Sequence, residues 1–405
     1  RYIGEAKVLR AYNYYELYTK FGDIPYTTKV LSIKESMSIA RTAKATVIAN
    51  VLADLDEVIN GNYLPTSYDA DNKGRITRWA AMAIKAKIYL FEGNWTQVKN
   101  ITSTIMTEGG FKLFGSYAGL FEIANEYNSE VILDAQYRPT SREHQMMYVF
   151  LPPTLGGYSQ LSPLQELVDS YIMLDGKTIK ETGTSFDESH PYANRDPRLK
   201  ATVMYTGNSY TLADGTEVVI NCEKGEGKDG YGVGSDCSAT GYYIKKYWDN
   251  TYRATLYSGL NPILIRYADI LLMNAEALAE LGELDKTAWD ATIKPIRDRA
   301  GFTLASALEF PEGASKDKLI EIVRNERRSE LALEGHRHKD IIRWRIADNV
   351  LNGWCHGLKT NDVVGTDDGY VRVENRTFNA NKHYLWPIPQ AERDLNGNLE
   401  QNPNW

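Results

Sequence analysis

Apolar residues recur at helical spacing through 263–344, and this pattern predicts three consecutive helices joined by short turns. Their expected ranges are 263–281, about 285–299 and 318–334. Pro262 suits the first turn of the first helix, and Gly282 suits the position just past its end. One face of that helix carries Ile265, Ala268, Leu272, Ala275 and Ala279. Most of these residues are alanine, so a second helix can approach this face closely.

Helical spacing also appears in the first quarter of the chain. Helices are expected over 2–21, 43–60, 77–92 and about 95–107. Residues 86–93 match residues 275–282 at a constant offset, and each segment is followed by a second amphipathic helix. A small residue for close packing, a glycine turn and a return helix are typical of tetratricopeptide-type helix pairs. The pattern therefore predicts a scaffold of helix pairs interrupted by long connections.

Between about 110 and 260 the helical periodicity is lost. There we expect a strand over 131–137, a loop over 138–160, a helix over 163–172, a hairpin over 201–220, a glycine-rich loop over 221–241 and a strand over 242–248. The predicted fold class is mainly α. It comprises a tetratricopeptide-like helix-pair scaffold over about 1–108 and 261–345, an irregular loop- and hairpin-rich region over 110–260 and an irregular C-terminal part over 346–405, all within a single domain over 1–405.

Composition narrows the range of functions. The net charge is −7 and no basic run occurs, which argues against a nucleic-acid partner. No stretch of about 20 apolar residues could span a membrane. The chain has 27 Tyr and 8 Trp but only 10 Phe. Tyrosine and tryptophan suit half-exposed surfaces, so a sugar-binding surface and a tyrosine-rich core are both compatible with this usage.

Several short motifs occur in the order found in the SusD/RagB family, which the chain resembles over nearly its whole length. They are Glu5-Ala-Lys-Val-Leu-Arg-Ala11 with Phe21-Gly-Asp-Ile-Pro25; Ala53-Asp-Leu-Asp56; Ala86-Lys-Ile-Tyr-Leu90 with Gly93-Asn-Trp95; Asn194-Arg-Asp-Pro-Arg198; Ile265-Arg-Tyr-Ala-Asp-Ile-Leu-Leu-Met-Asn-Ala-Glu-Ala277; Asn325-Glu-Arg-Arg-Ser-Glu-Leu-Ala-Leu-Glu-Gly-His-Arg337 with Trp344; and Trp386-Pro-Ile-Pro389 with Asn402-Pro-Asn-Trp405.

The resemblance implies a non-catalytic, cell-surface glycan-binding lipoprotein of the Bacteroidetes type. It would bind oligo- or polysaccharide and deliver it to a SusC-like TonB-dependent transporter in the outer membrane, held there by an N-terminal lipid anchor. The family's signal peptide and lipid-bearing cysteine do not occur here, and Arg1 already lies in a helical pattern. We therefore expect that an N-terminal segment is missing. A glycan-degrading hydrolase and a protein-interaction scaffold are the alternative functions.

The loop over 138–160 and its flanks offer the best candidate ligand surface. A sugar ring presents an apolar face and a belt of hydroxyls, so its recognition needs a flat aromatic ring and fixed polar groups. This loop supplies both, through Tyr137, Arg138, Arg142, His144, Tyr148 and Tyr158. A second cluster is Trp248 with Tyr252 and Tyr257. For each single tyrosine, packing in the core is the alternative role.

No cofactor or metal is expected. His336 and His338 are one residue apart, but zinc needs three or four ligands and no other His or Cys lies nearby in sequence. The glycine-rich run over 225–234 lacks the strand and helix that a phosphate loop requires. Acidic and basic residues alternate over 321–334, which we interpret as a charge-laced helix rather than a ligand site.

The three cysteines are Cys222, Cys237 and Cys355. The first two flank the glycine-rich loop, and the cell-surface location that the resemblance implies would favour oxidation. We therefore expect a disulfide between Cys222 and Cys237, which leaves Cys355 free. Free buried thiols are the alternative.

Overall fold

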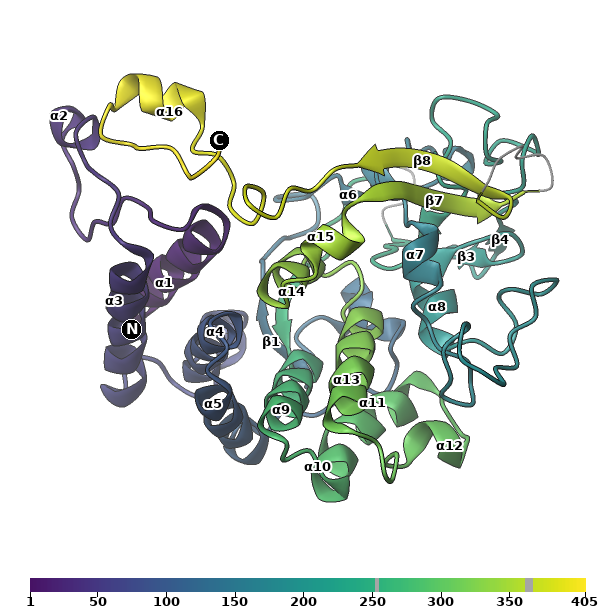
Figure 1. Ribbon diagram of the computed structural model, residues 1–405, viewed down its shortest axis with the longest axis horizontal. Helices are drawn as coiled ribbons and strands as arrows, with labels where there is room; N and C mark the ends of the chain where they lie inside the picture. Colours follow the sequence, from purple (N-terminus) through teal and green to yellow (C-terminus); the bar gives the residue numbers. More distant parts are fainter. Residues whose placement is uncertain (252–254, 361–366) are drawn as a thin grey trace. The chain divides into compact units, whose positions relative to one another are not determined.

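The computed structural model describes residues 1–251, 255–360 and 367–405 (Figure 1). They form two compact units, and each is discontinuous in sequence. Unit 1 comprises Arg1–Gly110, His336–Asn352 and Thr377–Trp405. Unit 2 comprises Phe111–Gly335 and Gly353–Arg376. The expected single domain over 1–405 remains a prediction.

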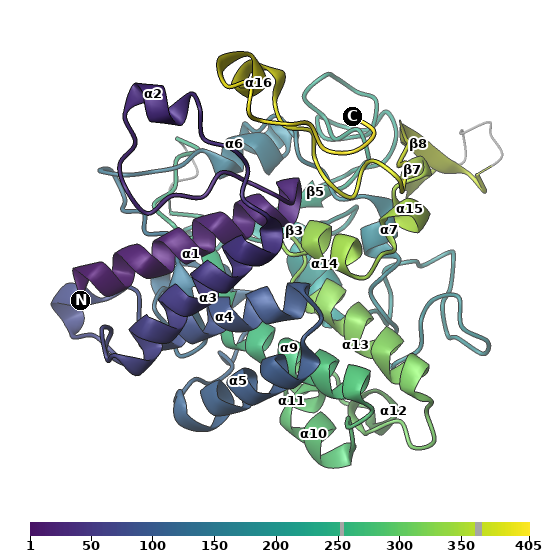
Figure 2. The same ribbon diagram turned by 60° about the vertical axis from the view of Figure 1, so that its left-hand side comes forward.

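Four helices at the start of the chain form the body of unit 1 (Figure 2). They are α1 (Tyr2–Phe21), α3 (Lys44–Asn60), α4 (Arg78–Phe91) and α5 (Trp95–Glu108), with α1 against α3, α3 against α4 and α4 against α5. The predicted ranges are confirmed to within one or two residues. Thr77 and Asn94 cap α4 and α5 by accepting a hydrogen bond from the main-chain N–H of the third residue of each helix. The buried alanines of α4 permit close packing on both sides.

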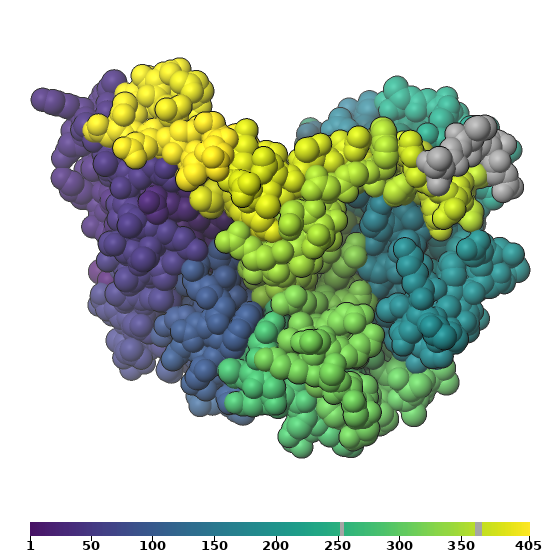
Figure 3. Space-filling model, in the orientation of Figure 1, coloured from purple at the N-terminus to yellow at the C-terminus, as the bar shows by residue number. Residues whose placement is uncertain are grey.

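The C-terminal residues complete unit 1. They contribute α14 (Arg337–Arg343), α15 (Ala347–Val350) and α16 (Gln390–Leu395), and they pack near the short α2 (Ile33–Ser36). Figure 3 shows the yellow C-terminal segment lying directly on purple N-terminal atoms. Arg41 donates to the Asn402 side-chain oxygen at 2.6 Å, and Asn402 donates to the Phe21 carbonyl at 3.0 Å. These bonds fix the connection that leaves α1.

Helices α9 (Tyr267–Leu281), α11 (Ile293–Ala300) and α13 (Lys316–Glu330) lie side by side in unit 2 (Figure 1). The shorter helices of this part are α10 (Lys286–Ala291) and α12 (Ala305–Leu308). Leu272 and Ala275 are both fully buried, as predicted for the packing face of the first helix. The mainly α, tetratricopeptide-like fold class is confirmed.

Three predicted helix limits in this part are wrong. Ile263–Arg266 forms strand β6, which pairs antiparallel with β1 (Val131–Asp134), so the first helix starts only at Tyr267. The predicted helix over 285–299 is interrupted at Thr292, and Pro295 near the start of α11 has no N–H to continue the earlier helix. The last helix ends at Glu330, and turns follow it.

All strands of unit 2 form two-stranded antiparallel pairs. Besides β1 and β6 they are β2 (Val203–Met204) with β5 (Tyr243–Ile244), β3 (Ser209–Thr211) with β4 (Glu217–Val219), and β7 (Gly353–Lys359) with β8 (Tyr370–Arg376). The 201–220 hairpin is confirmed. The prediction that 346–405 is irregular is wrong for β7 and β8. Their residues are polar and half-exposed, so the sequence shows only a weak alternation of the kind that predicts a strand. The predicted helix over 163–172 is wrong in length, because only Gln165–Val168 is helical.

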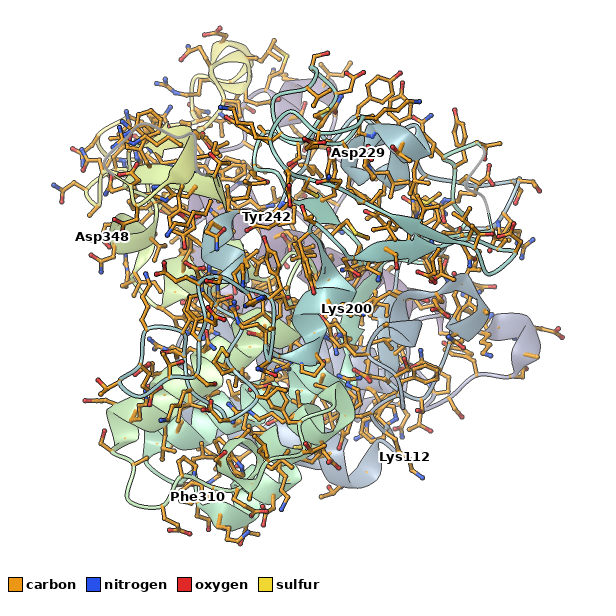
Figure 4. All side chains as sticks on the ribbon, turned by 90° about the vertical axis from the view of Figure 1, so that its right-hand side faces the viewer. Lys112, Lys200, Asp229, Tyr242, Phe310 and Asp348 are labelled. Atoms are coloured by element: carbon orange, nitrogen blue, oxygen red, sulfur yellow. The ribbon has the colours of Figure 1, made fainter. Side chains whose placement is uncertain are left out.

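Short helices occupy the rest of the irregular region. They are α6 (Met146–Phe150), α7 (Gln165–Val168) and α8 (Pro197–Thr202), with single 3₁₀ turns at Gly119–Phe121, Ile123–Asn125 and Pro153–Leu155 here and at Ala70–Asn72 in unit 1. Tyr242 and Asp229 lie in the upper half of Figure 4 and Phe310 at its bottom. Figure 1 shows the β3–β4 and β7–β8 pairs at the opposite end of this unit from α10 and α12.

The tyrosines of unit 2 include a buried group and an exposed group. Its core buries Tyr117, Tyr171, Tyr210, Tyr242 and Tyr243 almost completely. Tyr148, Tyr158 and Tyr257 remain more than one-third exposed. The tyrosine-rich composition thus reflects both a packed core and an exposed aromatic surface.

The predicted disulfide between Cys222 and Cys237 is wrong, because both thiols are free. Cys222 lies in the core of unit 2, where burial raises the pKa of its thiol to about 12. Cys237 instead directs its thiol to the Lys228 carbonyl at 3.0 Å. The glycine-rich loop is closed by main-chain bonds, since Tyr231 donates to the Cys222 carbonyl at 3.1 Å.

A buried cluster of charges occupies the centre of unit 2. It consists of Arg198, Lys246, Arg266, Arg297, Arg299 and Arg327 with Glu130, Asp196, Asp269, Glu326, Glu330 and Glu334. Glu330 accepts from Arg198 at 2.8 Å, from Arg266 at 2.6 Å and from Arg299. The charges of the expected charge-laced helix over 321–334 are thus paired, but its inner face is buried and its partners lie on other segments of the chain.

These contacts control the protonation of Glu330. Burial alone would raise its pKa, but the nearby charges of Arg299, Arg266 and Arg198 outweigh this effect and hold the pKa well below its usual value. The pKa of Glu326 and of Glu334 is lowered in the same way by arginine or lysine partners that outweigh burial. All three carboxylates remain charged inside the protein at neutral pH.

We predict that this cluster makes the protein sensitive to acid. A carboxylate with a depressed folded-state pKa stabilises the fold fully above its unfolded value of about 4.5 and loses this contribution as the pH falls. The free energy of unfolding from urea titrations should therefore decrease steadily below about pH 5. Glu330→Gln should cost about 3–5 kcal/mol at pH 7, since it removes the one carboxylate that pairs with three buried arginines at once and leaves excess positive charge in the cluster. The exposed Glu312→Gln is the control, and equal stability of both variants would contradict the prediction.

A second prediction concerns the packing face of α9. Ala275→Trp should lower the free energy of unfolding by about 1–3 kcal/mol or more, because a fully buried alanine leaves no room for an indole. Ala291→Trp, on an exposed position of α10, is the control and should have little effect. An unchanged melting temperature of Ala275→Trp would refute the close-packing argument.

Candidate functional site

Strand β1 leads directly into the candidate loop, and its exit is held by buried polar contacts. The Tyr137 N–H donates to the Asn261 side-chain oxygen at 2.6 Å, and Asn261 donates to Asp134 at 3.1 Å. Arg138 and Arg142 exchange two main-chain hydrogen bonds of 2.8 and 2.9 Å, which closes a tight turn. The start of the loop is therefore fixed to the β1–β6 pair.

Tyr137, Arg142 and His144 form one cluster at this turn. The Arg142 guanidinium lies 5.4 Å from the centre of the Tyr137 ring, and the His144 ring meets Tyr137 edge-on at 4.8 Å. His144 Nε2 donates to the Leu260 carbonyl at 2.9 Å, and its Nδ1 accepts from the Met146 N–H at 3.3 Å. Both ring nitrogens of His144 are thus used within the protein, so this histidine positions the loop.

Tyr148 and Tyr158 form a second, exposed pair. Their ring centres lie 4.3 Å apart with the planes tilted by 35°, and the side chains are 36% and 39% exposed. The Tyr158 N–H donates to the Tyr148 carbonyl at 2.9 Å. The side-chain hydrogen bond that the Tyr148 hydroxyl donates to Tyr158 raises the pKa of Tyr148, and desolvation adds to this effect.

The turn between these two tyrosines depends on a close backbone approach. A Cβ atom at Gly157 would lie 2.1 Å from the Leu151 carbonyl oxygen, so only glycine fits. The Ser159 hydroxyl donates to the same carbonyl at 3.1 Å, and the Thr154 N–H donates to the buried Asp229 carboxylate at 2.8 Å. These contacts hold Tyr148 and Tyr158 in place against the rest of unit 2.

Trp248 belongs to a different part of the surface. Its indole N–H donates to the Thr211 carbonyl at 2.8 Å, and its ring meets the buried Tyr210 edge-on at 5.2 Å. These contacts tie Trp248 to the β3–β4 hairpin. Tyr252, which we grouped with it, lies outside the described residues. The role of all the predicted residues in ligand binding remains a prediction.

An apolar hollow of about 270 Å³ lies beside the exposed tyrosine pair, along α6. It is lined by Met146, Val149, Phe150, Leu161, Ser162, Ile244, Tyr247 and Leu333. Ser162 and the hydroxyl of Tyr247 are its only polar side-chain groups. This lining suits packing better than sugar recognition, because it offers few fixed partners for hydroxyl groups.

Pattern analysis did not single out Tyr192 and Tyr205. Their rings stack 4.0 Å apart with only 17° between the planes, beside a hollow of about 510 Å³. Tyr192 precedes the Asn194-Arg-Asp-Pro-Arg198 motif by two residues. This proximity to a family motif is the feature of the sequence that could have pointed to Tyr192. The pairing itself depends on two segments that meet only in the folded chain.

Among the described residues, no group of three or more His, Cys, Asp or Glu side chains could hold a metal ion. In the same part of the chain no helix has both the length and the apolar character needed to cross a membrane. His336 and His338 flank the start of α14, and the His338 ring meets Trp386 edge-on at 6.0 Å.

Comparisons with known proteins agree with this architecture. A family model described as "SusD family" matches residues 120–405, and one described as "Starch-binding associating with outer membrane" matches residues 1–90. SusD-like protein P25 of Formosa agariphila is 28% identical over 373 residues, which cover 86% of this chain and 64% of that protein. This chain therefore spans 64% of the length of that curated relative.

Solved structures show the same fold. A SusD-like carbohydrate binding protein from Bacteroides fragilis superposes with a TM-score of 0.87 and 29% identity, over 98% of this chain and 79% of that chain. A laminarin binding SusD-like protein has a TM-score of 0.67 and 24% identity, over 100% of this chain and 79% of that chain. The second likeness shows the fold alone.

The geometry of the loop yields a third prediction. Gly157→Ala should displace the turn and separate Tyr148 from Tyr158, because the new methyl group would overlap the Leu151 carbonyl. We expect a loss of about 1–3 kcal/mol in stability and a reduced near-ultraviolet tyrosine dichroism. Gly234→Ala is the matched control, since nothing lies within 4 Å of that position. If both variants kept the wild-type signal, the close approach at Gly157 would not be required.

Proposed function

Because this chain belongs to the SusD family, we propose that it binds an oligo- or polysaccharide without cleaving it and delivers it to a SusC-like TonB-dependent transporter. The name of the Bacteroides fragilis relative, a carbohydrate binding protein, supports the ligand class. The observation that carries the proposal is the exposed Tyr148–Tyr158 pair on a loop that hydrogen bonds hold in place.

The tyrosine pair has the properties that a sugar platform needs. An aromatic ring buries the apolar face of a sugar and gains about 25 cal/mol for each Å² removed from water. A hydrogen bond to a sugar hydroxyl replaces one to water and contributes only about 1 kcal/mol net. Stacking should therefore dominate the affinity. Because Tyr148 and Tyr158 are held by main-chain bonds, little ordering is needed on binding.

Polar groups for the hydroxyl belt are available on the same loop. Arg138 and Arg142 are exposed next to the tight turn that their main chains form. Their guanidinium groups carry several donors in a fixed plane, and the Tyr148 and Tyr158 hydroxyls add further partners. The loop thus combines aromatic faces with donors, as the sequence led us to expect.

Membership of the family supports the proposed location and partner. The description "associating with outer membrane" supports a place at that membrane. We propose that an N-terminal lipid anchor outside residues 1–405 holds the protein on the cell surface and that the transporter accepts the glycan there.

A fourth prediction tests the function and its site together. Tyr148→Ala and Tyr158→Ala should each weaken glycan binding by about tenfold or more while leaving the melting temperature unchanged, since both side chains are exposed. The measurement is isothermal titration with a glycan chosen from an array that includes starch and laminarin. Val219→Ala, which removes an exposed apolar side chain from β4, is the control.

The array also separates the alternative functions. Binding without shortened products supports the proposal, cleavage would identify a hydrolase, and the absence of any glycan interaction would favour a protein-interaction scaffold. Wild-type affinity of both tyrosine variants would place the glycan site elsewhere on the protein.

A further inference from the structure

A second hollow in unit 2 has the features of a built binding site. Its volume is about 510 Å³, which lies within the usual range for ligand sites. It is lined by residues 189–193, 205–207 and 222–223, with Leu358 and Lys359 of β7. None of these residues belongs to the 137–158 loop. The stacked rings of Tyr192 and Tyr205 provide its aromatic wall.

The position of Tyr192 is determined by buried partners. Its hydroxyl donates to the Tyr242 hydroxyl oxygen at 3.2 Å, and Tyr242 donates to Gln165 at 2.6 Å. Both Tyr242 and Gln165 are buried. Burial raises the pKa of Tyr192 to about 12, so its hydroxyl stays protonated and keeps its role as donor.

The chain around Tyr192 is fixed by a buried arginine. Arg195 donates to the Pro191 and Val168 carbonyls at 2.7 Å each and to the Tyr171 carbonyl at 2.8 Å. On the other side of the hollow, Thr206 accepts from the Cys222 N–H at 3.1 Å and joins two of the lining segments. The hollow is therefore held in shape before any ligand arrives.

Two polar groups of the lining are open to a ligand. The Tyr205 hydroxyl and the Glu223 carboxylate have no side-chain hydrogen-bond partner among the residues that the structure describes. The two basic side chains of the lining already have partners, because His190 contacts Asp187 at 2.8 Å and Lys359 contacts Glu188 at 3.2 Å. The charge left without a partner in this hollow is therefore the negative charge of Glu223.

The side chains that line this hollow favour one chemical class of ligand. Flat tyrosine rings and the apolar side chains of Pro191 and Leu358 suit the apolar face of a sugar ring. Glu223 can accept hydrogen bonds from neighbouring hydroxyls, whereas a carboxylate or sulfate on the sugar would meet its negative charge. We propose that this hollow is a second saccharide site, separate from the Tyr148–Tyr158 pair, and that it takes a neutral sugar unit. The inference rests on the proposed glycan-binding function.

A second site changes how the protein holds a polymer. Once one sugar unit of a polysaccharide is bound at the Tyr148–Tyr158 pair, another unit of the same chain reaches the hollow as an intramolecular partner. Binding to a long polymer is then much tighter than binding to a short fragment that fills one site. This is the behaviour expected of a protein that retains a large glycan at the cell surface.

The test uses the full chain and a defined set of probes. These are neutral oligosaccharides of glucose, galactose, mannose and xylose, the polymers laminarin and starch in native affinity gels, and polygalacturonate as the anionic counterpart. Tyr205→Ala removes the open aromatic face, Tyr205→Phe keeps the ring as its matched control, and Glu223→Gln removes the charge. Tyr148→Ala reports on the other site, and melting temperatures confirm folding.

We expect calorimetry on the wild type to give two bound neutral oligosaccharides per chain, and Tyr205→Ala to give one. Tyr205→Ala should also weaken polymer retention by about tenfold, while Tyr205→Phe changes it by less than about threefold. Glu223→Gln should weaken neutral sugars and allow polygalacturonate to bind more tightly than it binds the wild type.

Each result separates the two sites. If no probe shows binding that depends on Tyr205, the second site is refuted, while loss of binding in Tyr148→Ala alone still supports the proposed function. If Tyr205→Ala removes binding and Tyr148→Ala does not, the second site stands and the first location is wrong. Equal affinity of the wild type for neutral sugars and polygalacturonate at the Tyr205 site would overturn its assignment to neutral sugars.

Discussion

The fold of unit 2 depends on the ion pairs around Glu330. This carboxylate lies at the end of α13 and meets Arg198 of α8, Arg266 at the junction of β6 and α9, and Arg299 of α11. Arg266 in turn pairs with Glu130, the residue that precedes β1. The segments that lead into the loops of unit 2 are therefore all held by the same cluster of buried charges. Taking these charges out of water is costly, so the cluster requires every partner to be present.

This dependence explains what sequence analysis could and could not predict. Helices with strong apolar periodicity were located well, because that pattern reports a buried face directly. The burial of Glu330 was not predictable, since its partners are 64 residues away at Arg266 and 132 residues away at Arg198. The run at 263–266 was assigned to a helix because branched apolar residues suit both helix and strand. This run forms a strand because it pairs with β1, and that pairing depends on the tertiary structure.

The candidate site shows the same limit. Tyr148 and Tyr158 are close in sequence, so their shared surface could be predicted from one irregular, aromatic loop. Tyr192 and Tyr205 stack on each other, although the Asn194-Arg-Asp-Pro-Arg198 motif and α8 lie between them in the sequence. The alternative roles of tyrosine, packing and ligand binding, are separated only by exposure, which depends on neighbours far along the chain. His144 illustrates this, because both of its ring nitrogens are used by the protein itself.

Two segments far apart in the sequence, residues 20–41 and 386–402, meet in unit 1, which has a consequence for how the protein folds during synthesis. Arg41 and the end of α1 are held by Asn402, and the Trp386 N–H donates to the Lys20 carbonyl at 2.7 Å. A ribosome releases Arg41 long before Asn402 exists, because 361 positions separate the two residues. The segment after α1 therefore lacks these contacts until Asn402 has been synthesised. Removal of residues 386–402 would leave that segment without these partners and open to proteolysis.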